Sequence, residues 1–225
     1  MASNSKNIIS KDFPPEPTLR RLPWYLAYLG LLRSQGVEYV SSTTISKSLN
    51  VDASQIAKDL SVLNVKGKTR IGYQVAALEE ALQKFLGFGR SHNAVILGVG
   101  SLGSALIADI GLNRFGLNIV AGFDTNPSIV GTNIQQIPIY DIHTLCERQK
   151  KLHAEIAIIA VPIEVAQQVA DLAVEAGIKA LWNFTPFRIL TAPGIVIQNT
   201  SIYAHLAVMY NRLNALTPSH ESDSI

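Results

Sequence analysis

The sequence predicts an α/β protein with two domains: an N-terminal winged helix-turn-helix domain, and a doubly wound parallel sheet that ends in one further helix. Three observations support this fold class. A short helical stretch, a three-residue turn and a second helical stretch follow one another between residues 42 and 63. From residue 92 onward, short apolar runs typical of buried strands alternate with helical stretches. Gly87-Phe88-Gly89 interrupts the chain between the two parts and puts the boundary at about residue 88.

The composition indicates a folded protein. The 225 residues are 48% hydrophobic and 16% charged, which is enough apolar material for real cores. No apolar run approaches the roughly 18 residues that span a bilayer, and the polar start lacks the apolar segment of a signal peptide. The single cysteine, Cys146, excludes an internal disulfide framework and leaves no metal cluster. We therefore expect a soluble, cytoplasmic protein with no membrane contact and no metal.

The charge is distributed unevenly along the chain. Residues 1–90 hold twelve Lys or Arg and seven Asp or Glu, a net charge of +5, whereas residues 91–225 carry −3. A basic first part suits a module that binds a polyanion. A solvated basic face would give the same charge, so the charge alone does not decide between them.

In the first domain, a tail over residues 1–17 is expected to be flexible and residues 18–88 to be folded. Thr18 is the predicted N-cap of the first helix, whose apolar stripe consists of Leu22, Leu26, Leu29 and Leu32. Pro23 falls in the second turn, where it favours a kink or a late start. Gly36 ends this helix, and a short extended piece follows over residues 37–40.

The helix-turn-helix comes next. Ser41-Ser42-Thr43-Thr44 caps a helix through Leu49, and Asp52 or Ser54 caps a second helix that runs to about Leu63. The predicted inward face of the second helix consists of Ile56, Leu60 and Leu63. Four other side chains are expected to face outward or sideways and to be able to touch phosphates and base edges: Gln55, Lys58, Asp59 and Ser61.

A basic segment over residues 66–75 completes the domain. It has two glycines, three basic residues and a β-prone end, which predict a hairpin, or wing, against a phosphate backbone. A last helix over residues 76–86 is expected to point Leu78, Leu82 and Phe85 inward. The alternative is an ordinary small helical domain without a nucleic-acid role.

The second domain opens with a glycine motif. A buried strand over residues 94–97 leads into the spacing G-x-G-x-x-G at Gly98, Gly100 and Gly103, and a helix is predicted over residues 104–110. Gly98 permits a tight turn, Gly100 lets the backbone approach a pyrophosphate, and Gly103 allows close packing of helix on sheet. The helix N-terminus would then face the phosphates.

An acidic residue completes this pattern. Asp124 ends a second strand, over residues 118–123, and lies 21 residues after Gly103, close to the spacing of about 20 for the acid that binds a ribose. A carboxylate there accepts a free 2′-hydroxyl and repels a 2′-phosphate, so NAD(H) is expected rather than NADP(H). A tight structural turn is the alternative. The full pattern predicts a Rossmann domain over residues 89–200.

Further strands are expected at residues 137–140, 155–161, 180–183 and 195–198, with helices at 142–151 and 165–176. Cofactor contacts should lie at the carboxyl ends of the strands. The cofactor-binding residues predicted in this domain are Gly98, Val99, Gly100, Ser101, Leu102, Gly103, Asp124, Thr125, Ala160, Val161, Pro162, Asn183, Phe184, Thr185 and Pro186.

The last helix is predicted over residues 201–215, with a polar tail at 216–225, and its apolar stripe suggests packing on another subunit. No catalytic group is evident. His143 and His153 are placed far from the predicted strand ends, and only His205 is a candidate to lie near a nicotinamide. We therefore expect a protein that holds a dinucleotide without reacting it and is not an enzyme.

Both halves match one family. The sequence resembles the Rex redox-sensing transcriptional repressors from about residue 15 to 213. The matching segments are Arg20-Arg21-Leu22-Pro23 with Tyr25; Val40-Ser41-Ser42; Gln55-Ile56; Lys58-Asp59-Leu60-Ser61; Gly72-Tyr73-Gln74-Val75; the glycine motif; Phe123-Asp124; Val161-Pro162; Ala176-Gly177-Ile178-Lys179; and Asn183-Phe184-Thr185-Pro186.

The resemblance implies a homodimer that binds double-stranded operator DNA when NADH is scarce. NADH would draw the two Rossmann domains together and release the operator, and NAD⁺ would compete without forcing release. The final helix would be swapped between subunits and reach into the partner near its cofactor pocket, which adds Ile202 to the expected cofactor-binding residues. The residues expected to contact DNA are Arg20, Arg21, Ser41, Ser42, Ser54, Gln55, Lys58, Asp59, Ser61, Lys66, Lys68, Arg70 and Tyr73.

The chain departs from the family pattern at several positions. Ala57 replaces a usual arginine in the recognition helix, Val65-Lys66-Gly67 replaces the usual phenylalanine-glycine entry to the wing, and Asp109 stands at a usual tyrosine position. Ser201 and His205 replace two acids at the start of the final helix. The alternatives that stay open are an NAD-dependent oxidoreductase, a CoA- or nucleotide-binding module, and a DNA-binding family member with weakened redox sensing.

Overall fold

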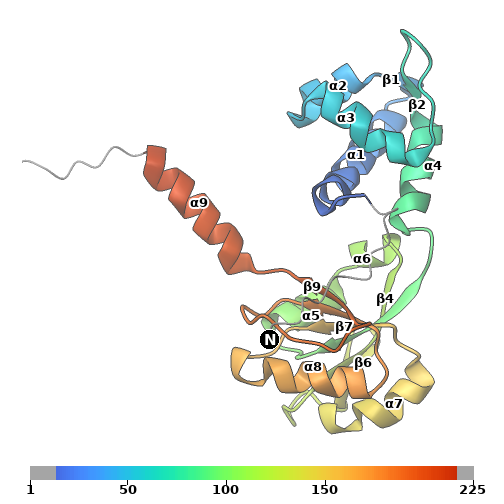
Figure 1. Cartoon of the computed structure of the whole chain (residues 1–225). Coiled ribbons are helices and arrows are strands. Elements are labelled where there is room, and N and C mark those ends of the chain that lie inside the picture. The colour runs from blue at the N-terminus through green and yellow to red at the C-terminus, as the bar shows by residue number, and fades with distance from the viewer. Residues whose placement is uncertain (1–13, 217–225) are drawn as a thin grey trace, which may run out of the picture. The chain divides into compact units, whose positions relative to one another are not determined.

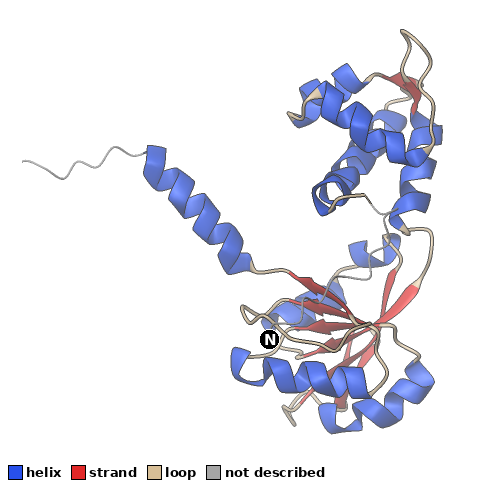
Figure 2. Cartoon of the chain, viewed as in Figure 1, coloured by secondary structure: helices blue, strands red, loops and turns tan. Residues whose placement is uncertain are grey.

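The computed structural model describes residues 14–216 (Figure 1), and its helices and strands are distinguished in Figure 2. The described chain falls into two compact units that divide between Ser91 and His92. Residues 1–13 and 217–225, which hold most of the predicted N-terminal tail and nearly all of the predicted C-terminal tail, lie outside the described residues.

The first unit is a helical domain with a short antiparallel hairpin (Figure 2). Its elements are α1 (Glu16–Ser34), β1 (Tyr39–Val40), α2 (Ser42–Leu49), α3 (Ala53–Leu60), the 3-10 turn η1 (Ser61–Leu63), β2 (Tyr73–Gln74) and α4 (Val75–Leu86). Strands β1 and β2 pair, and a bridge between Lys68 and Gly72 extends the hairpin that was predicted as a wing. The core is built from all four helices, with Leu22 and Tyr25 of α1 completely buried.

Three details of the first unit differ from the prediction. Helix α1 begins at Glu16 with Pro15 as N-cap, so Thr18 lies inside the helix and is not its cap. The helix contains Pro23, so of the kink or late start predicted there the late start was wrong. The burial of Leu22 and its neighbours on the same face offsets one lost backbone hydrogen bond. The prediction that Phe85 faces inward was wrong, since it is 37% exposed.

The second unit is a seven-stranded sheet with helices on both faces (Figure 1). Its elements are β3 (His92–Leu97), α5 (Ser101–Ala108), α6 (Gly111–Arg114), β4 (Leu117–Asp124), β5 (Asn133–Ile134), β6 (Ile137–Asp141), η2 (Ile142–Thr144), α7 (Leu145–Leu152), β7 (Ile156–Ile159), η3 (Ile163–Val165), α8 (Ala166–Glu175), β8 (Ala180–Asn183), β9 (Val196–Asn199) and α9 (Ile202–Leu216). This architecture confirms the predicted doubly wound sheet.

The strand order is β5-β6-β4-β3-β7-β8-β9, and every pair is parallel except the short β5–β6 pair. The chain runs from β3 outward through β4 and β6, then returns to place β7 on the other side of β3. In open α/β sheets such a reversal leaves a crevice at the carboxyl ends of the two strands. Strands β3 and β7 therefore define where a ligand is expected to bind.

Alternate residues of the central strands serve two separate cores. Val95 and Leu97 pack in a cluster with residues of α7 and α8, whereas Ile96 packs in a second cluster with Ile107 of α5. Because both faces of β3 are covered, its last four residues, 94–97, are all apolar. The helix after the glycine motif begins at Ser101 and ends at Ala108, earlier at both ends than predicted, and β5 was not predicted.

Helix α9 has no buried residue. Its exposed apolar side chains are Ile202, Tyr203, Val208, Met209, Tyr210, Leu213 and Leu216. Between residues 14 and 216, no helix combines the length and the apolar character needed to cross a membrane.

Candidate functional site

Two of the three motif glycines are required by packing. Gly98 turns the chain at the end of β3 with φ of +93°, and a Cβ there would lie 2.6 Å from the carbonyl oxygen of Ala160. A Cβ on Gly103 would overlap the carbonyl oxygen of Gly98, so a residue with a side chain fits there only if the backbone shifts. The glycine loop therefore packs closely against the end of β7 and against α5, the helix that follows it.

Gly100 differs from the other two. A Cβ at this position would have no atom within 4 Å, so nothing in the described chain requires glycine there. Gly100 is also the N-cap of α5 and has no side chain that could bind the amides of the first turn. Free amides and the positive end of the helix dipole suit an anion. Open space beside this backbone fits a pyrophosphate, which is consistent with the role predicted for Gly100.

Asp124 lies against the same loop from β4. Its Oδ2 accepts a hydrogen bond of 2.7 Å from the backbone N–H of Val99, and its Oδ1 accepts one of 2.8 Å from the N–H of Asn126. An ionised carboxylate has about four acceptor positions, so two remain for ribose hydroxyls. The acid that was predicted to recognise the ribose is thus held in place by backbone groups.

A cavity of about 1050 Å³ opens beside the loop. The predicted residues that line it are Gly98, Gly100, Asp124, Thr125, Ala160, Val161 and Pro162. These come from the ends of β3, β4 and β7, as expected for a crevice at a reversal of strand order. The remaining loop residues Val99, Ser101, Leu102 and Gly103 belong to the turn and the first turn of α5 but do not line the cavity.

Part of the cavity wall was not predicted. These lining residues are Ile142, His143, Glu164, Val165, Gln167, Gln168, Val169, Asp171, Leu172 and Glu175. They belong to the helical segments η2, η3 and α8 that follow β6 and β7. The placement of His143 far from the strand ends was therefore wrong: Asp141 caps η2 at the end of β6, and this brings His143 to the cavity.

The residues predicted at the end of β8 do not line the cavity. Asn183 is fully buried, and its amide nitrogen donates to the Phe187 carbonyl and to Asn199 at 2.7 and 2.9 Å. Its oxygen accepts from the N–H and the hydroxyl of Thr185. Phe184 packs on Trp182 with ring centroids 4.8 Å apart. Asn183, Phe184, Thr185 and Pro186 therefore form the end of β8 and the loop that follows it. Ile202, on α9, is 53% exposed.

The first unit contains the predicted helix-turn-helix. The hydroxyl of Ser41 accepts the N–H of Thr44 and caps α2, and the carboxylate of Asp52 accepts the N–H groups of Ser54 and Gln55 and caps α3. Between the two helices, Asn50 adopts the left-handed conformation, with φ of 52°. The turn therefore consists of three residues, of which Asn50 ends α2 and Asp52 is the cap of α3.

Most of the predicted DNA contacts are at the surface. Arg20, Ser54, Lys58, Ser61, Lys66, Lys68 and Arg70 are exposed, and Ser41, Ser42, Gln55 and Tyr73 are partly exposed. In the wing, the Lys68 ammonium donates a hydrogen bond of 2.9 Å to the hydroxyl of Tyr39, and this bond raises the pKa of Lys68. The wing thus presents a fixed positive charge beside an aromatic ring.

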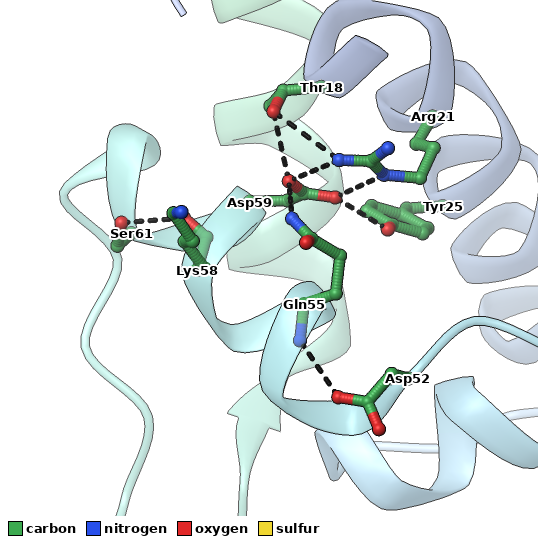
Figure 3. Close-up of polar contacts among 8 residues, drawn as sticks. All are labelled: Thr18, Arg21, Tyr25, Asp52, Gln55, Lys58, Asp59 and Ser61. Carbon is green, nitrogen blue, oxygen red and sulfur yellow. Dashed lines mark hydrogen bonds and ion pairs between the residues drawn. The ribbon is translucent and has the colours of Figure 1, made fainter. Parts of the chain in front are cut away.

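Asp59 is an exception. It was predicted to face outward or sideways, and this was wrong, because only 1% of it is exposed. Its carboxylate binds Arg21, another residue predicted to contact DNA, with Oδ2 2.6 Å from the guanidinium Nε (Figure 3). The apolar neighbours of Asp59 on α3 point into the core, and Asp59 follows them because α1 supplies a cation there.

The chain was compared with known proteins. A family model described as "Putative DNA-binding protein N-terminus" matches residues 15–61, and one described as "CoA binding domain" matches residues 90–187. The redox-sensing transcriptional repressor Rex of Bacteroides thetaiotaomicron is 58% identical over 215 residues, which cover 95% of this chain and 98% of that protein. That of Porphyromonas gingivalis is 55% identical over 90% of this chain and 93% of that protein.

This chain belongs to the Rex family of redox-sensing transcriptional repressors. Solved structures agree over both units. RSP, a Rex-family repressor, in complex with β-NAD⁺ and operator DNA is 33% identical, with a TM-score of 0.86 over 91% of this chain and 94% of that one. RSP in complex with β-NADH is 33% identical, with a TM-score of 0.82 over 94% and 97%. The predicted family and fold class are confirmed.

The structure gives local roles to residues at which this Rex-family member departs from the pattern. Asp109 follows α5, and its Oδ1 accepts the N–H of Gly111 at 2.7 Å, which starts α6. The Nδ1 atom of His205 lies 2.9 Å from the Ser201 carbonyl oxygen at the start of α9. Ala57 is exposed on α3. None of these four residues, Asp109, Ser201, His205 and Ala57, is part of a hydrophobic core.

Proposed function

We propose that this chain is a DNA-binding transcriptional repressor that senses the NADH/NAD⁺ ratio and leaves operator DNA when NADH binds. One observation carries the proposal. Over 91% of its length, and so over both units, the chain matches a repressor described in complex with β-NAD⁺ and operator DNA. A match confined to one unit would support only DNA binding or only nucleotide binding.

The first unit supports the DNA-binding half. A helix-turn-helix places its second helix in the major groove, and basic side chains beside it neutralise phosphates. Here α3 presents Lys58, and the wing presents Lys66, Lys68 and Arg70, all of them exposed. We propose that these side chains bind the backbone of double-stranded operator DNA, with the rest of the predicted DNA-binding set, apart from the buried Asp59 and its partner Arg21, around them.

The second unit supports the NAD(H)-binding half. The free amides at the start of α5 and the open space at Gly100 fit a pyrophosphate, and the carboxylate of Asp124 fits a ribose. The dinucleotide exists in an oxidised and a reduced form, and that difference is the signal. We propose that the chain binds both forms, and that NADH lowers its affinity for DNA more than NAD⁺ does.

We further propose a homodimer in which α9 packs against a second copy. Six of the exposed apolar side chains of α9 are Ile202, Tyr203, Val208, Met209, Tyr210 and Leu216, and exposed apolar patches mark sites of protein–protein contact. The proposed domains are 18–88 for DNA, 89–200 for NAD(H) and 201–215 for the swapped helix. Because its relatives are named repressors, we propose a cytoplasmic regulator that is not an enzyme.

The test is fluorescence anisotropy on a labelled palindrome from a bound promoter, titrated with NADH and, separately, with NAD⁺. Release by NADH but not by NAD⁺ supports the proposal. Tight binding that neither nucleotide changes would indicate a repressor with weakened sensing. Oxidation of NADH that depends on an added substrate would instead indicate an oxidoreductase.

A CoA-binding module is the second candidate, because the model that matches residues 90–187 is described as a CoA-binding domain. CoA also has a pyrophosphate, but its ribose carries a 3′-phosphate that the carboxylate of Asp124 would repel. Competition decides between the two: under the first proposal NADH displaces bound CoA at a far lower concentration than CoA displaces NADH.

A further inference from the structure

The carboxylate of Asp59 is buried in the first unit and accepts five hydrogen bonds. Its Oδ1 accepts from Thr18 at 3.0 Å, from Arg21 Nη2 at 2.8 Å and from the amide of Gln55 at 2.8 Å. Its Oδ2 accepts from Arg21 Nε at 2.6 Å and from the hydroxyl of Tyr25 at 2.8 Å. Figure 3 shows α1 contributing three of these partners on one side and α3 contributing Gln55 on the other.

The charge of this group is stabilised in place. Burial by itself would raise the pKa of Asp59, but the hydrogen bonds that it accepts, that from Arg21 first, outweigh burial and hold the pKa at about 2. Burial and the bond to Asp59 raise the pKa of Tyr25 to about 12. At neutral pH the carboxylate is therefore ionised and the phenol protonated, and every partner donates to Asp59.

Stability alone does not require such a network. Apolar side chains of similar volume often stabilise a core as well as a buried ion pair does, because ions are costly to desolvate. What apolar packing cannot supply is direction, since each hydrogen bond fixes the angle between donor and acceptor. This network joins α1 to α3, the second helix of the helix-turn-helix, and so holds the orientation of α3.

The network also orients one side chain near the start of α3, that of Gln55. Gln55 follows the cap Asp52 by three residues, in the part of a recognition helix that meets base edges. An ionised carboxylate can only accept hydrogen bonds, so the amide of Gln55 must turn its nitrogen to Asp59. The amide oxygen then points away from Asp59, as an acceptor for the amino group of adenine or cytosine.

We propose that Asp59 is a positioning residue for DNA recognition: its carboxylate holds α3 against α1 and turns the amide of Gln55 so that the amide oxygen is presented to the base edges. This rests on the proposed DNA-binding function. Asp59 itself touches no DNA. The two α1 residues Arg21 and Tyr25 act on sequence recognition through Asp59.

The first experiment selects bound sequences from a random double-stranded DNA library. Gln55→Ala and Asp59→Asn should relax the preference at the same base pairs. The matched control is Glu79→Gln, which removes another buried carboxylate that joins α1, through Arg33 at 3.1 Å, to α4 rather than α3. It should lower stability without changing the preferred sequence. A folded Asp59→Asn protein with the wild-type preference would overturn the inference.

A second experiment does not depend on the folding of Asp59→Asn. Tyr25→Phe removes one hydroxyl, and no direct hydrogen bond joins Tyr25 to Gln55 among those found in the structure; they share Asp59. Tyr25→Phe should lower operator affinity in wild-type protein by at least about twofold more than it does in Gln55→Ala protein, as expected of residues in one network. Additive effects would contradict the inference. Wild-type protein that selects no sequence would refute the proposed function instead.

Discussion

The Oδ2 atom of Asp124 lies 2.7 Å from the backbone nitrogen of Val99. This contact joins the end of β4 to the glycine loop after β3, and a second contact from Asn126 fixes the other carboxylate oxygen. The carboxylate is therefore already oriented before a ribose arrives, so less conformational freedom is lost on binding.

We expect Asp124→Ala to weaken NADH binding by about ten- to a hundredfold, because hydrogen bonds to a charged group contribute roughly 1.5–3 kcal/mol. Isothermal titration with NADH measures the change. Glu155→Gln is the control: this carboxylate pairs with His92 at the amino ends of β3 and β7 and should leave the affinity unchanged. An Asp124→Ala protein with wild-type affinity would exclude Asp124 from the ribose site.

Gly100 and Gly103 should respond to substitution in opposite ways. Gly100→Val places its side chain in open space, so we expect a change in unfolding free energy of about 1 kcal/mol or less but no measurable NADH binding. Gly103→Ala forces a Cβ against the Gly98 carbonyl oxygen and should destabilise the fold by several kcal/mol. Urea unfolding and NADH titration of both variants separate the two effects. Unchanged NADH affinity in Gly100→Val would remove the pyrophosphate from this loop.

Lys58→Ala and Lys68→Ala should each weaken operator binding and lower the slope of log affinity against log salt by about 0.9, the value for one lost phosphate contact. Lys84→Ala, which removes a lysine from the last turn of α4, is the matched control for net charge. Anisotropy at several salt concentrations gives the slopes. A slope equal to that of the wild type would show that the lysine concerned is not a phosphate contact.

The Asp59 network should make the first unit sensitive to acid. The pKa of Asp59 in the folded chain, about 2, lies below its ordinary value of 3.8, so its contribution is present above pH 4 and is lost as pH falls toward 2. The shift corresponds to about 2 kcal/mol, and Asp59→Asn should remove this part of the pH dependence. Urea unfolding followed by Trp24 fluorescence, in a Trp182→Phe background, measures it. An equally steep acid loss in Asp59→Asn would assign it to other carboxyls.

The residues that the sequence predicted well are those whose role is local. The spacing of Gly98, Gly100 and Gly103 depends only on a strand, a turn and a helix in succession, and all three lie where expected. Capping of α2 within Ser41-Ser42-Thr43-Thr44 and of α3 by Asp52 or Ser54 was also predicted. The structure selects Ser41 and Asp52, each of which accepts a backbone N–H two or three positions away. The alternation of strands with helices is likewise a local pattern, and it was sufficient to predict the sheet.

Two of the errors, at Asp59 and His143, depend on parts of the chain that are far apart in the sequence. Asp59 lies three residues after the buried Ile56, on the inward face of α3. Its charge predicted an exposed position, because the sequence does not show that Arg21, 38 positions earlier, lies beside it. His143 reaches the cavity because β6 and β7 end at the same edge of the sheet, and strand order is not visible in the periodicity of the sequence. Tertiary proximity decided both positions.

The core of the first unit shares no residue with the two cores of the second. A substitution at an exposed position of α3, such as Ala57, therefore replaces no residue of either core of the second unit and none that lines its cavity. Over evolutionary time the two surfaces are free to diverge at different rates. A lineage can redirect such a regulator to new promoters through a handful of outward-facing positions while the chemistry of its metabolite pocket stays under separate selection.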